Sequence, residues 1–336
     1  MSESTGQMHF LNIYITKSAS VTCMNITFLG TGAPFPTKDR NVTSIAVQLG
    51  SDAVLFDCGE GTQRQLLHSN LSFMKIKRIY ISHMHGDHIF GLPGLVQTMG
   101  LNNRTEPLDI LVPQGFSQDI RTLLEIGVGG RPFEVAIKEL TPDHAETLGE
   151  FTLRTTYIDH STPTVALAIE EAPRRGKFDR KKAEALGIPP GPLYSKITGG
   201  ESVTVSGRVI SPGDILGPSR CGRKLVICAD TAPCPQLTDL AKDANVLIYE
   251  ATFDDALAQK AQEFKHSTNI QAANVAKQCN VGHLVLYHFS TRYCQEEVDK
   301  MVLDCKAVFP EVVAANDLDE FVLSLDGQLR RNGPSK

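Results

Sequence analysis

The chain has 336 residues, of which 41% are apolar, so it can form one large domain or two small ones with a sizeable core. Its net charge of −5 excludes a protein that is basic overall, and any surface for nucleic acid must therefore be local. No apolar run approaches the roughly 18 residues that span a membrane, and the first residues match neither a secretory signal nor an Arg-rich transit peptide, so we expect a cytoplasmic protein without a membrane partner.

The first 23 residues show no clear periodicity, and we expect a flexible extension that ends before Met24. A convincing strand follows at Asn25–Leu29. From there to about residue 170, short β-rich runs alternate with Gly and Pro, which interrupt regular structure. Helical periodicity lies between these runs, at Thr62–Leu71 and Ser117–Ile126. The further strands that we expect in this part are Ser44–Leu49, Ala53–Phe56, Arg78–Ser82, Leu108–Val112 and Phe151–Tyr157.

The segment 170–200 differs from the rest in composition. It carries six Arg and Lys against one Asp between Arg174 and Lys182, and then the Gly- and Pro-rich run Gly187–Pro192. Such a run is stiff because each proline ring fixes its own φ angle. A basic stretch attracts a phosphate backbone without reading its sequence, although a basic run by itself is more often only a solvated surface.

After Arg220 the pattern becomes strand, helix and strand. We expect strands at Lys224–Ala229, Val246–Glu250 and His283–His288, with a helix from about residue 268 to 279. Such units after a β-rich first half indicate an α/β protein in which two sheets pack face to face with helices outside, a four-layer αββα sandwich. The expected divisions are an extension at 1–23, a domain at 24–330 with an insertion at 170–200, and a tail at 331–336.

Three histidines and an aspartate lie within six positions directly after an apolar strand: His83, His85, Asp87 and His88. Imidazole and carboxylate together suit zinc and similar divalent ions. Neighbouring side chains point apart, so one tetrahedral ion could not easily take all four groups, whereas two ions could share them. A solvent loop that is rich in histidine by chance is the alternative interpretation.

Two ions require more ligands, and three further residues stand in the same position relative to a strand. His160, Asp230 and His288 each follow an apolar run. The carboxyl ends of strands are where α/β sheets gather their sites. Either histidine alone is more often a core or surface residue, but together with the first cluster they predict a two-metal centre.

The run His83-x-His85-x-Asp87-His88, preceded by Phe56–Gln63, resembles the metallo-β-lactamase superfamily. The resemblance implies two Zn²⁺ ions, although other divalent ions would suit the same ligands. It also implies that Asp57 orients a metal-binding loop without binding metal, whereas an aspartate that only begins a turn is the alternative. The implied ligands are His83, His85 and His160 for one ion, Asp87, His88 and His288 for the other, and Asp230 as the bridge.

Two further motifs resemble those of the ribonuclease Z family within this superfamily. Glu250 lies in Tyr-Glu-Ala-Thr and His266 in His-Ser-Thr. The resemblance implies that the glutamate orients the histidine, which then protonates the leaving 3′-oxygen. A carboxylate-held imidazole is a good general acid near neutral pH. Tyr249 stands where many members of the family have His, and the alternative for His266 is a residue that merely precedes a helix cap.

The loop that begins at Pro36 matches the pattern P-x-K-x-R-N of ribonuclease Z at every specified position. The resemblance implies that Lys38, Arg40 and Asn41 bind substrate phosphates near the cleaved bond, and a solvated charged turn is the alternative. Arg292 follows the predicted ligand His288 closely and could contact the scissile phosphate, although a surface ion pair is equally consistent with its position.

Between His160 and Asp230, the segment 170–200 resembles the protruding arm by which this family grips the tRNA elbow. The arm residues that the resemblance implies as RNA contacts are Arg174, Arg175, Lys177, Arg180, Lys181 and Lys182. Their charge would contribute affinity for the RNA backbone.

The resemblance extends from Met24 to about Phe321. It implies an endonuclease that removes the 3′ trailer of precursor tRNA after the discriminator nucleotide and leaves a 3′-hydroxyl on the tRNA. Asp87 would orient the attacking water, and His266 with Glu250 would protonate the leaving oxygen. A homodimer, in which one subunit's arm holds the tRNA that the other cuts, is also implied.

Two other functions remain open at this stage. A small-molecule metallohydrolase, such as a cyclic-nucleotide phosphodiesterase, would share every metal ligand but would have no use for the basic arm. A non-enzymatic RNA- or protein-binding module on an inactive hydrolase scaffold is the second alternative, and the complete ligand set argues against it.

Overall fold

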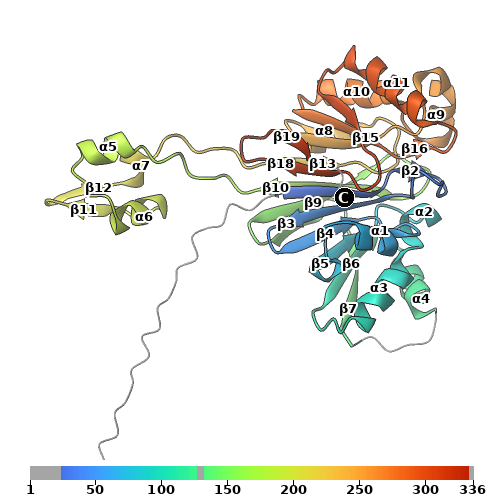
Figure 1. Cartoon of the computed structure of the whole chain (residues 1–336), viewed down its shortest axis with the longest axis horizontal. Coiled ribbons are helices and arrows are strands. Elements are labelled where there is room, and N and C mark those ends of the chain that lie inside the picture. Colours follow the sequence, from blue (N-terminus) through green and yellow to red (C-terminus); the bar gives the residue numbers. More distant parts are fainter. Residues whose placement is uncertain (1–23, 127–131, 333–336) are drawn as a thin grey trace, which may run out of the picture.

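The structure is a computed structural model and describes residues 24–126 and 132–332; the extension predicted at 1–23 lies outside this part. Its two large sheets lie face to face with helices on their outer faces (Figure 1). The predicted four-layer αββα sandwich is therefore confirmed. Within the described part of the chain, no helix has the length and apolar character needed to cross a bilayer.

The first sheet contains strands from the N-terminal half of the chain and two strands from its C-terminal end. β1 pairs antiparallel with β18 and β3, whereas β4, β5, β6 and β7 are mutually parallel neighbours. In spatial order the strands are β19 (Leu329–Asn332), β18 (Glu320–Leu323), β1 (Met24–Gly30), β3 (Ser44–Leu49), β4 (Asp52–Phe56), β5 (Ile76–Tyr80), β6 (Leu108–Pro113) and β7 (Val135–Leu140).

The second sheet is parallel in its C-terminal half and antiparallel elsewhere. β13, β14, β15 and β17 run in one direction, and β10 runs antiparallel to both β13 and β9. β9 therefore points the same way as β13. In spatial order the strands are β17 (Val312–Ala314), β15 (His283–Tyr287), β14 (Val246–Glu250), β13 (Lys224–Ile227), β10 (Thr164–Glu171), β9 (Phe151–Ile158) and β8 (Ala145–Leu148). A separate parallel pair joins β2 (Gly32–Ala33) to β16 (Phe289–Ser290).

Helices from the two halves of the chain cover opposite faces of the sandwich (Figure 1). The N-terminal group is α1 (Thr62–His68), α2 (Gly86–Ile89), α3 (Leu92–Leu101) and α4 (Ser117–Glu125), with the 3-10 turn η1 (Phe73–Lys75). The C-terminal group is α8 (Pro235–Ala241), α9 (Ala258–Phe264), α10 (Asn269–Gln278) and α11 (Gln295–Lys306), with the 3-10 turn η2 (Asp255–Leu257).

Both faces of the central strands are buried, which explains why these strands read as continuous apolar runs in the sequence. In β4, Val54 and Phe56 belong to the core that the two sheets share, whereas Ala53 and Leu55 pack beneath the N-terminal helices. Successive side chains of β4 thus point alternately into two separate hydrophobic cores.

The segment between β10 and β13 leaves the sandwich as a paired stalk and ends in a small separate unit, at the left of Figure 1. The predicted protruding arm is therefore present. It continues beyond the expected end at residue 200, because a hairpin and a further helix follow there. The elements of the unit are α5 (Arg180–Ala185), α6 (Pro192–Thr198), β11 (Val203–Val205), β12 (Arg208–Ile210) and α7 (Pro212–Ile215).

The arm has a hydrophobic core of its own, formed by Ala183, Ile188, Ile197, Val203, Ile210 and Ile215. Its stalk is narrow. Arg174 and Arg220 exchange two backbone hydrogen bonds of 2.8 Å, and a Cβ on Gly176 would lie 1.8 Å from the Gly217 carbonyl oxygen. Only glycine at position 176 permits this close approach of the two chains.

Most expected strands are observed with small shifts at their ends. The strands at Ser44–Leu49 and Val246–Glu250 have the predicted bounds. The strand expected at Lys224–Ala229 ends at Ile227, and the residues after it turn toward the neighbouring loops. β19 extends to Asn332, so regular structure continues two residues into the predicted tail at 331–336.

Candidate metal centre

The predicted ligands lie at one edge of the sandwich, where strands of both sheets end. His83–His88 follow β5, His160 follows β9, and Asp230 and His288 follow β13 and β15. β9, β13 and β15 point in one direction, so their carboxyl ends meet at the same edge. The structure thus brings together all of the residues predicted as metal ligands.

One group of possible ligand atoms comes from His83, His85, His160 and Asp230, and these atoms all lie within 4.8 Å of one another. His85 presents Nδ1, which is 2.9 Å from His83 Nε2 and 3.5 Å from His160 Nε2. Asp230 Oδ2 is 3.7 Å from His83 Nε2. Three imidazoles and a carboxylate that converge in this way fit a divalent ion.

The second group comes from Asp87, His88 and His288. Asp87 Oδ2 is 3.5 Å from His88 Nε2 and 3.7 Å from His288 Nε2. Asp230 also borders this group, since its Oδ2 is 3.5 Å from His88 Nε2 and its Oδ1 is 3.1 Å from His288 Nε2. Asp230 therefore lies between both groups, in the position expected for a bridging carboxylate.

Several of these atoms are buried without a hydrogen-bond partner: His88 Nε2, His288 Nε2 and Asp230 Oδ1. A buried polar atom that makes no hydrogen bond costs free energy, and native proteins rarely leave one uncompensated. A cation at this position would satisfy all three atoms. The residues present therefore fit a divalent metal ion.

The histidines are held by hydrogen bonds on the ring nitrogen that faces away from the centre. Such bonds fix the tautomer and the orientation of the ring, so that the other nitrogen is free to bind metal. The bonds are His88 Nδ1 to Asp57 Oδ2 (2.7 Å), His83 Nδ1 to Ser82 Oγ (2.9 Å), His160 Nδ1 to the Lys265 carbonyl oxygen (2.9 Å) and His288 Nδ1 to Thr252 Oγ1 (2.8 Å).

Asp57 follows β4 directly and is fully buried. Its backbone has φ of 60°, a left-handed conformation that is uncommon outside glycine and typical of functional sites. Besides the bond from His88, its carboxylate accepts hydrogen bonds from the Ser82 backbone N–H and hydroxyl, each at 2.7 Å. Burial raises the pKa of Asp57, and the neighbouring His88 opposes this shift. Asp57 thus joins the ends of β4 and β5 and orients the loop that carries the ligands.

Glu250 is the last residue of β14 and is fully buried. One oxygen accepts hydrogen bonds from His266 Nδ1 (2.8 Å), the Ser267 N–H (3.0 Å) and the Thr231 N–H (3.1 Å). The other accepts from the Thr252 hydroxyl (2.6 Å) and N–H (3.0 Å). The Thr252 hydroxyl therefore links Glu250 to the ligand His288 as well.

His266 lies beside the metal groups, and its Nδ1 is 4.0 Å from Asp230 Oδ2. Burial would lower the pKa of His266, but the charge and hydrogen bond of Glu250 raise it to about 9. Glu250 therefore favours the protonated form of this imidazole. The Tyr249 hydroxyl lies 3.1 Å from Ser267 Oγ, so the tyrosine at this position supports the loop that carries His266.

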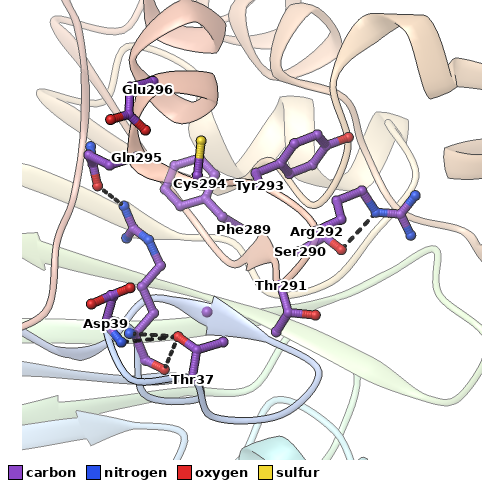
Figure 2. A pocket seen from close by; sticks show the side chains of 12 residues that line it. Thr37, Asp39, Phe289, Ser290, Thr291, Arg292, Tyr293, Cys294, Gln295 and Glu296 are labelled. Atoms are coloured by element: carbon purple, nitrogen blue, oxygen red, sulfur yellow. Dashed lines mark hydrogen bonds between the residues drawn. The ribbon is translucent and has the colours of Figure 1, made fainter.

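The loop that begins at Pro36 lies beside a hollow of about 560 Å³ (Figure 2). This loop lines one side of the hollow, and residues 289–296 line the other. Arg40 does not extend freely into solvent. Its guanidinium lies 4.9 Å from the Phe289 ring centroid and makes four hydrogen bonds inside the fold. Lys38 is exposed, whereas the Asn41 N–H donates to Asp317 Oδ2 at 2.6 Å. The three predicted phosphate contacts thus have different surroundings, and only Lys38 is fully open to substrate.

Arg292 is exposed on the opposite wall of this hollow (Figure 2). Its Nε donates to Ser290 Oγ at 2.9 Å, and its guanidinium lies 5.0 Å from the Phe253 ring centroid. This stacking orients the side chain while leaving the terminal nitrogens accessible to an anion.

The six basic residues predicted on the arm also divide into two kinds. Five are exposed: Arg175, Lys177, Arg180, Lys181 and Lys182. Arg174 is half-buried at the base of the stalk, where its Nη2 donates to the Leu325 carbonyl oxygen at 2.6 Å. Beyond the expected end of the arm, Lys196 and Arg208 add exposed positive charge that the sequence interpretation missed, since they lie outside the dense basic run.

Sequence reasoning also missed Ser82, Thr252 and the Lys265 carbonyl, which hold the metal-binding histidines. Serine and threonine are common everywhere, so neither residue type carried a signal. A backbone carbonyl has no sequence signal at all. These partners become identifiable only when the strand ends are assembled.

Comparisons with known proteins agree with this geometry. A family described as Anti-Pycsar protein Apyc1 matches residues 24–172, which is less than half of the chain and stops at the base of the arm. Ribonuclease Z of Methanosarcina acetivorans is 39% identical over 297 residues, covering 88% of this chain and 97% of its own. Identity of this level over nearly the whole length includes the arm and both halves of the metal centre.

Two solved structures show the same architecture. The short form of human tRNase Z is 28% identical, with a TM-score of 0.65 over 90% of this chain and 99% of its own. The metallo-β-lactamase fold protein YhfI from Bacillus subtilis is 19% identical, with a TM-score of 0.64 over 90% of this chain and 99% of its own, and supports the fold alone. The sandwich described above is thus the metallo-β-lactamase fold.

Replacing Asp57 by Asn should weaken divalent-metal affinity by about 10- to 100-fold, because the amide has one acceptor oxygen and cannot accept from both His88 Nδ1 and the Ser82 N–H. Chelator competition with Zn²⁺ measures the change. Asp52→Asn, at the other end of β4, is the matched control and should bind as wild type does. Equal affinities for Asp57→Asn and wild type would contradict the role given to Asp57.

Proposed function

This chain belongs to the ribonuclease Z family, and we infer that it is an endoribonuclease that processes the 3′ end of precursor tRNA. The observation that carries this inference is the combination, in one chain, of the His/Asp metal centre, the His266–Glu250 pair beside it, and a protruding basic arm. We propose further that cleavage follows the discriminator nucleotide and leaves a 3′-hydroxyl on the tRNA and a 5′-phosphate on the trailer.

We propose two Zn²⁺ ions as the cofactor. His83, His85 and His160 would hold one ion, Asp87, His88 and His288 the other, and Asp230 would contact both. The mixture of imidazole and carboxylate donors supports zinc over magnesium or calcium, which prefer oxygen ligands alone. Bound ions of this kind activate water and stabilise the charge that develops on a phosphodiester during in-line displacement.

The protein's own groups would carry the proton transfers. Burial would raise the pKa of Asp87, but His88 and His288 hold it below its ordinary value, so the carboxylate is ionised and can accept a hydrogen bond from the attacking water. His266 donates Nδ1–H to Glu250, which leaves Nε2 to protonate the departing 3′-oxygen. Because its pKa is raised to about 9, the acid form is present at neutral pH and is lost as pH rises through that value.

The RNA contacts would lie on two surfaces. On the arm we propose Arg175, Lys177, Arg180, Lys181 and Lys182, which are exposed and would bind phosphates without reading sequence. Near the centre we propose Lys38 and Arg292. Arg40 and Asn41 would act by shaping the loop that presents Lys38, since both are bonded within the fold.

We also propose a homodimer, in which one subunit's arm holds the tRNA that the other cuts. Leu67 and Phe90 support it, since both are large apolar side chains exposed beside a hollow between α1 and the start of α3. The cytoplasmic location expected from the sequence stays a prediction.

A small-molecule phosphodiesterase is the alternative function, because such an enzyme could use the same metal centre. Such an enzyme acts on a small substrate that an extended basic arm could not help to bind, and its leaving group need not be a 3′-alkoxide of RNA. The alternative therefore leaves the arm and the proposed acid without a purpose.

Cleavage of a labelled precursor tRNA distinguishes the two functions. Wild type should cut after the discriminator nucleotide, and His85→Ala should be inactive because it loses a metal ligand. A variant in which a short Gly-Ser linker replaces residues 175–219 keeps the Arg174–Arg220 pair at the base of the stalk. It should bind the RNA poorly but still hydrolyse bis(p-nitrophenyl) phosphate. Metal-loaded wild type that leaves the RNA intact yet hydrolyses the small ester would refute the proposed substrate.

The role of His266 can be separated from metal binding by the choice of leaving group. His266→Ala should slow precursor tRNA cleavage by about 100- to 10,000-fold, because the 3′-alkoxide needs a proton. Hydrolysis of bis(p-nitrophenyl) phosphate should change far less, since p-nitrophenolate leaves without protonation. Metal content should stay at the wild-type level. An equal loss on both substrates, or loss of metal, would argue against a general acid.

The proposed dimer predicts a particle of twice the chain mass in analytical ultracentrifugation. Leu67→Glu with Phe90→Glu should shift it to a monomer, because two charges would be buried in an apolar contact. Leu303→Glu, on an equally exposed apolar residue of α11, is the control. A wild-type monomer at all protein concentrations tested would exclude the dimer.

A further inference from the structure

A buried ion pair closes the base of the arm, where the two chains of the stalk leave the sandwich. Glu171 is the last residue of β10, and Arg223 directly precedes β13. Arg223 Nε donates to Glu171 Oε2 at 2.9 Å, and its Nη2 donates to Oε1 at 2.8 Å. The Arg223 N–H also donates to Glu171 Oε2 at 3.1 Å. This bidentate geometry holds both chains in one orientation, and both side chains are buried.

Arg174 belongs to the same arrangement. Its Nη2 donates to the Leu325 carbonyl oxygen at 2.6 Å, and its Nε lies 3.7 Å from Glu171 Oε2. Nε and Nη1 are buried and make no hydrogen bond. A phosphate therefore cannot reach most of this guanidinium, which distinguishes Arg174 from the five exposed basic residues farther along the arm.

Both arginines contact the same region, the end of β18 and the turn that follows it. Arg223 Nη1 donates to the Leu323 carbonyl oxygen at 2.8 Å, and Arg174 reaches Leu325 two residues later. The turn is itself closed, since the Ser324 N–H donates to the Gln328 carbonyl oxygen at 3.0 Å. The base of the arm is thus attached to the edge of the first sheet as well as to the second.

The stalk beyond this point has little to hold its direction. It is a pair of chains with backbone bonds at a few positions, such as Gly217 N–H to the Lys177 carbonyl oxygen at 2.9 Å. An isolated two-stranded ribbon has marginal stability and bends easily. Contacts with the sandwich at the base of the stalk are therefore what can constrain the direction of the arm.

We propose that Arg174, acting with the Glu171–Arg223 pair, is a positioning residue that fixes the direction of the arm relative to the metal centre by attaching its base to the β18–β19 turn. The consequence for catalysis rests on the proposed function, because only a long RNA substrate contacts arm and centre at once. Arg174 then contributes to cleavage of precursor tRNA without contacting the RNA.

The direction of the arm can be measured without RNA. Spin labels carried by non-canonical residues at position 204 on the arm and position 118 on the sandwich report the distance distribution between the two bodies by pulsed electron paramagnetic resonance. Arg174→Ala should broaden this distribution, and so should Arg174→Lys, because an ammonium cannot reproduce the guanidinium contacts. Lys181→Ala, on an exposed arm residue, should leave it unchanged. An unchanged distribution in Arg174→Ala would overturn the proposal.

Kinetics and salt dependence then separate positioning from direct contact with RNA. Arg174→Ala and Arg174→Lys should both lower kcat/KM on precursor tRNA by about 10- to 100-fold, as expected for a misplaced substrate. Hydrolysis of bis(p-nitrophenyl) phosphate serves as the folding control and should be unchanged. The slope of log affinity against log salt should stay at its wild-type value, whereas Lys181→Ala should reduce it by about one.

Two results would contradict one of these proposals. Wild-type activity in Arg174→Lys, with a reduced salt slope in Arg174→Ala, would show a direct phosphate contact and overturn the positioning role. Failure of wild type to cleave the RNA would refute the proposed function, while the distance distributions would still decide whether Arg174 directs the arm.

Discussion

The buried carboxylate of Asp230 is the constraint on which the centre depends. It lies between two groups of imidazoles, with His288 Nε2 at 3.1 Å, His88 Nε2 at 3.5 Å and His83 Nε2 at 3.7 Å. Burial alone would raise the pKa of Asp230, but the surrounding histidines hold it well below its ordinary value. A buried negative charge of this kind needs compensation, and its own unpartnered Oδ1, with the unpartnered Nε2 atoms of His88 and His288, shows where a cation would supply it.

The surrounding loops can hold this costly arrangement because a second layer of hydrogen bonds fixes four of the histidines: His83, His88, His160 and His288. Asp57 orients His88 and joins two strand ends, and its left-handed backbone is the strain that this position requires. Glu250 orients the proposed acid directly and reaches His288 through Thr252. The proposed acid and the predicted metal ligand His288 thus share one buried carboxylate, so a disturbance at Glu250 would reach both.

The arm would meet a different requirement under the proposed function, which is to hold a long substrate far from the metal centre. Its small separate core lets it fold as a unit, and its exposed lysines and arginines supply charge that the chain as a whole lacks at a net −5. The cost of a thin stalk is flexibility, which the buried pair of Glu171 and Arg223 counteracts at the base.

The sequence by itself determined the sandwich and the position of the ligands, because both depend on local patterns: apolar runs mark strands, and His83–His88, Asp230 and His288 follow such runs directly. It could not decide which charged residues face solvent. Arg40 and Arg174 have the same charge as the proposed phosphate contacts, but their guanidinium groups bond to Ala315 and Leu325, which lie 275 and 151 residues away in the chain. Only the tertiary structure brings such partners together, and whether an arginine binds substrate or supports the fold depends on whether a partner is within reach.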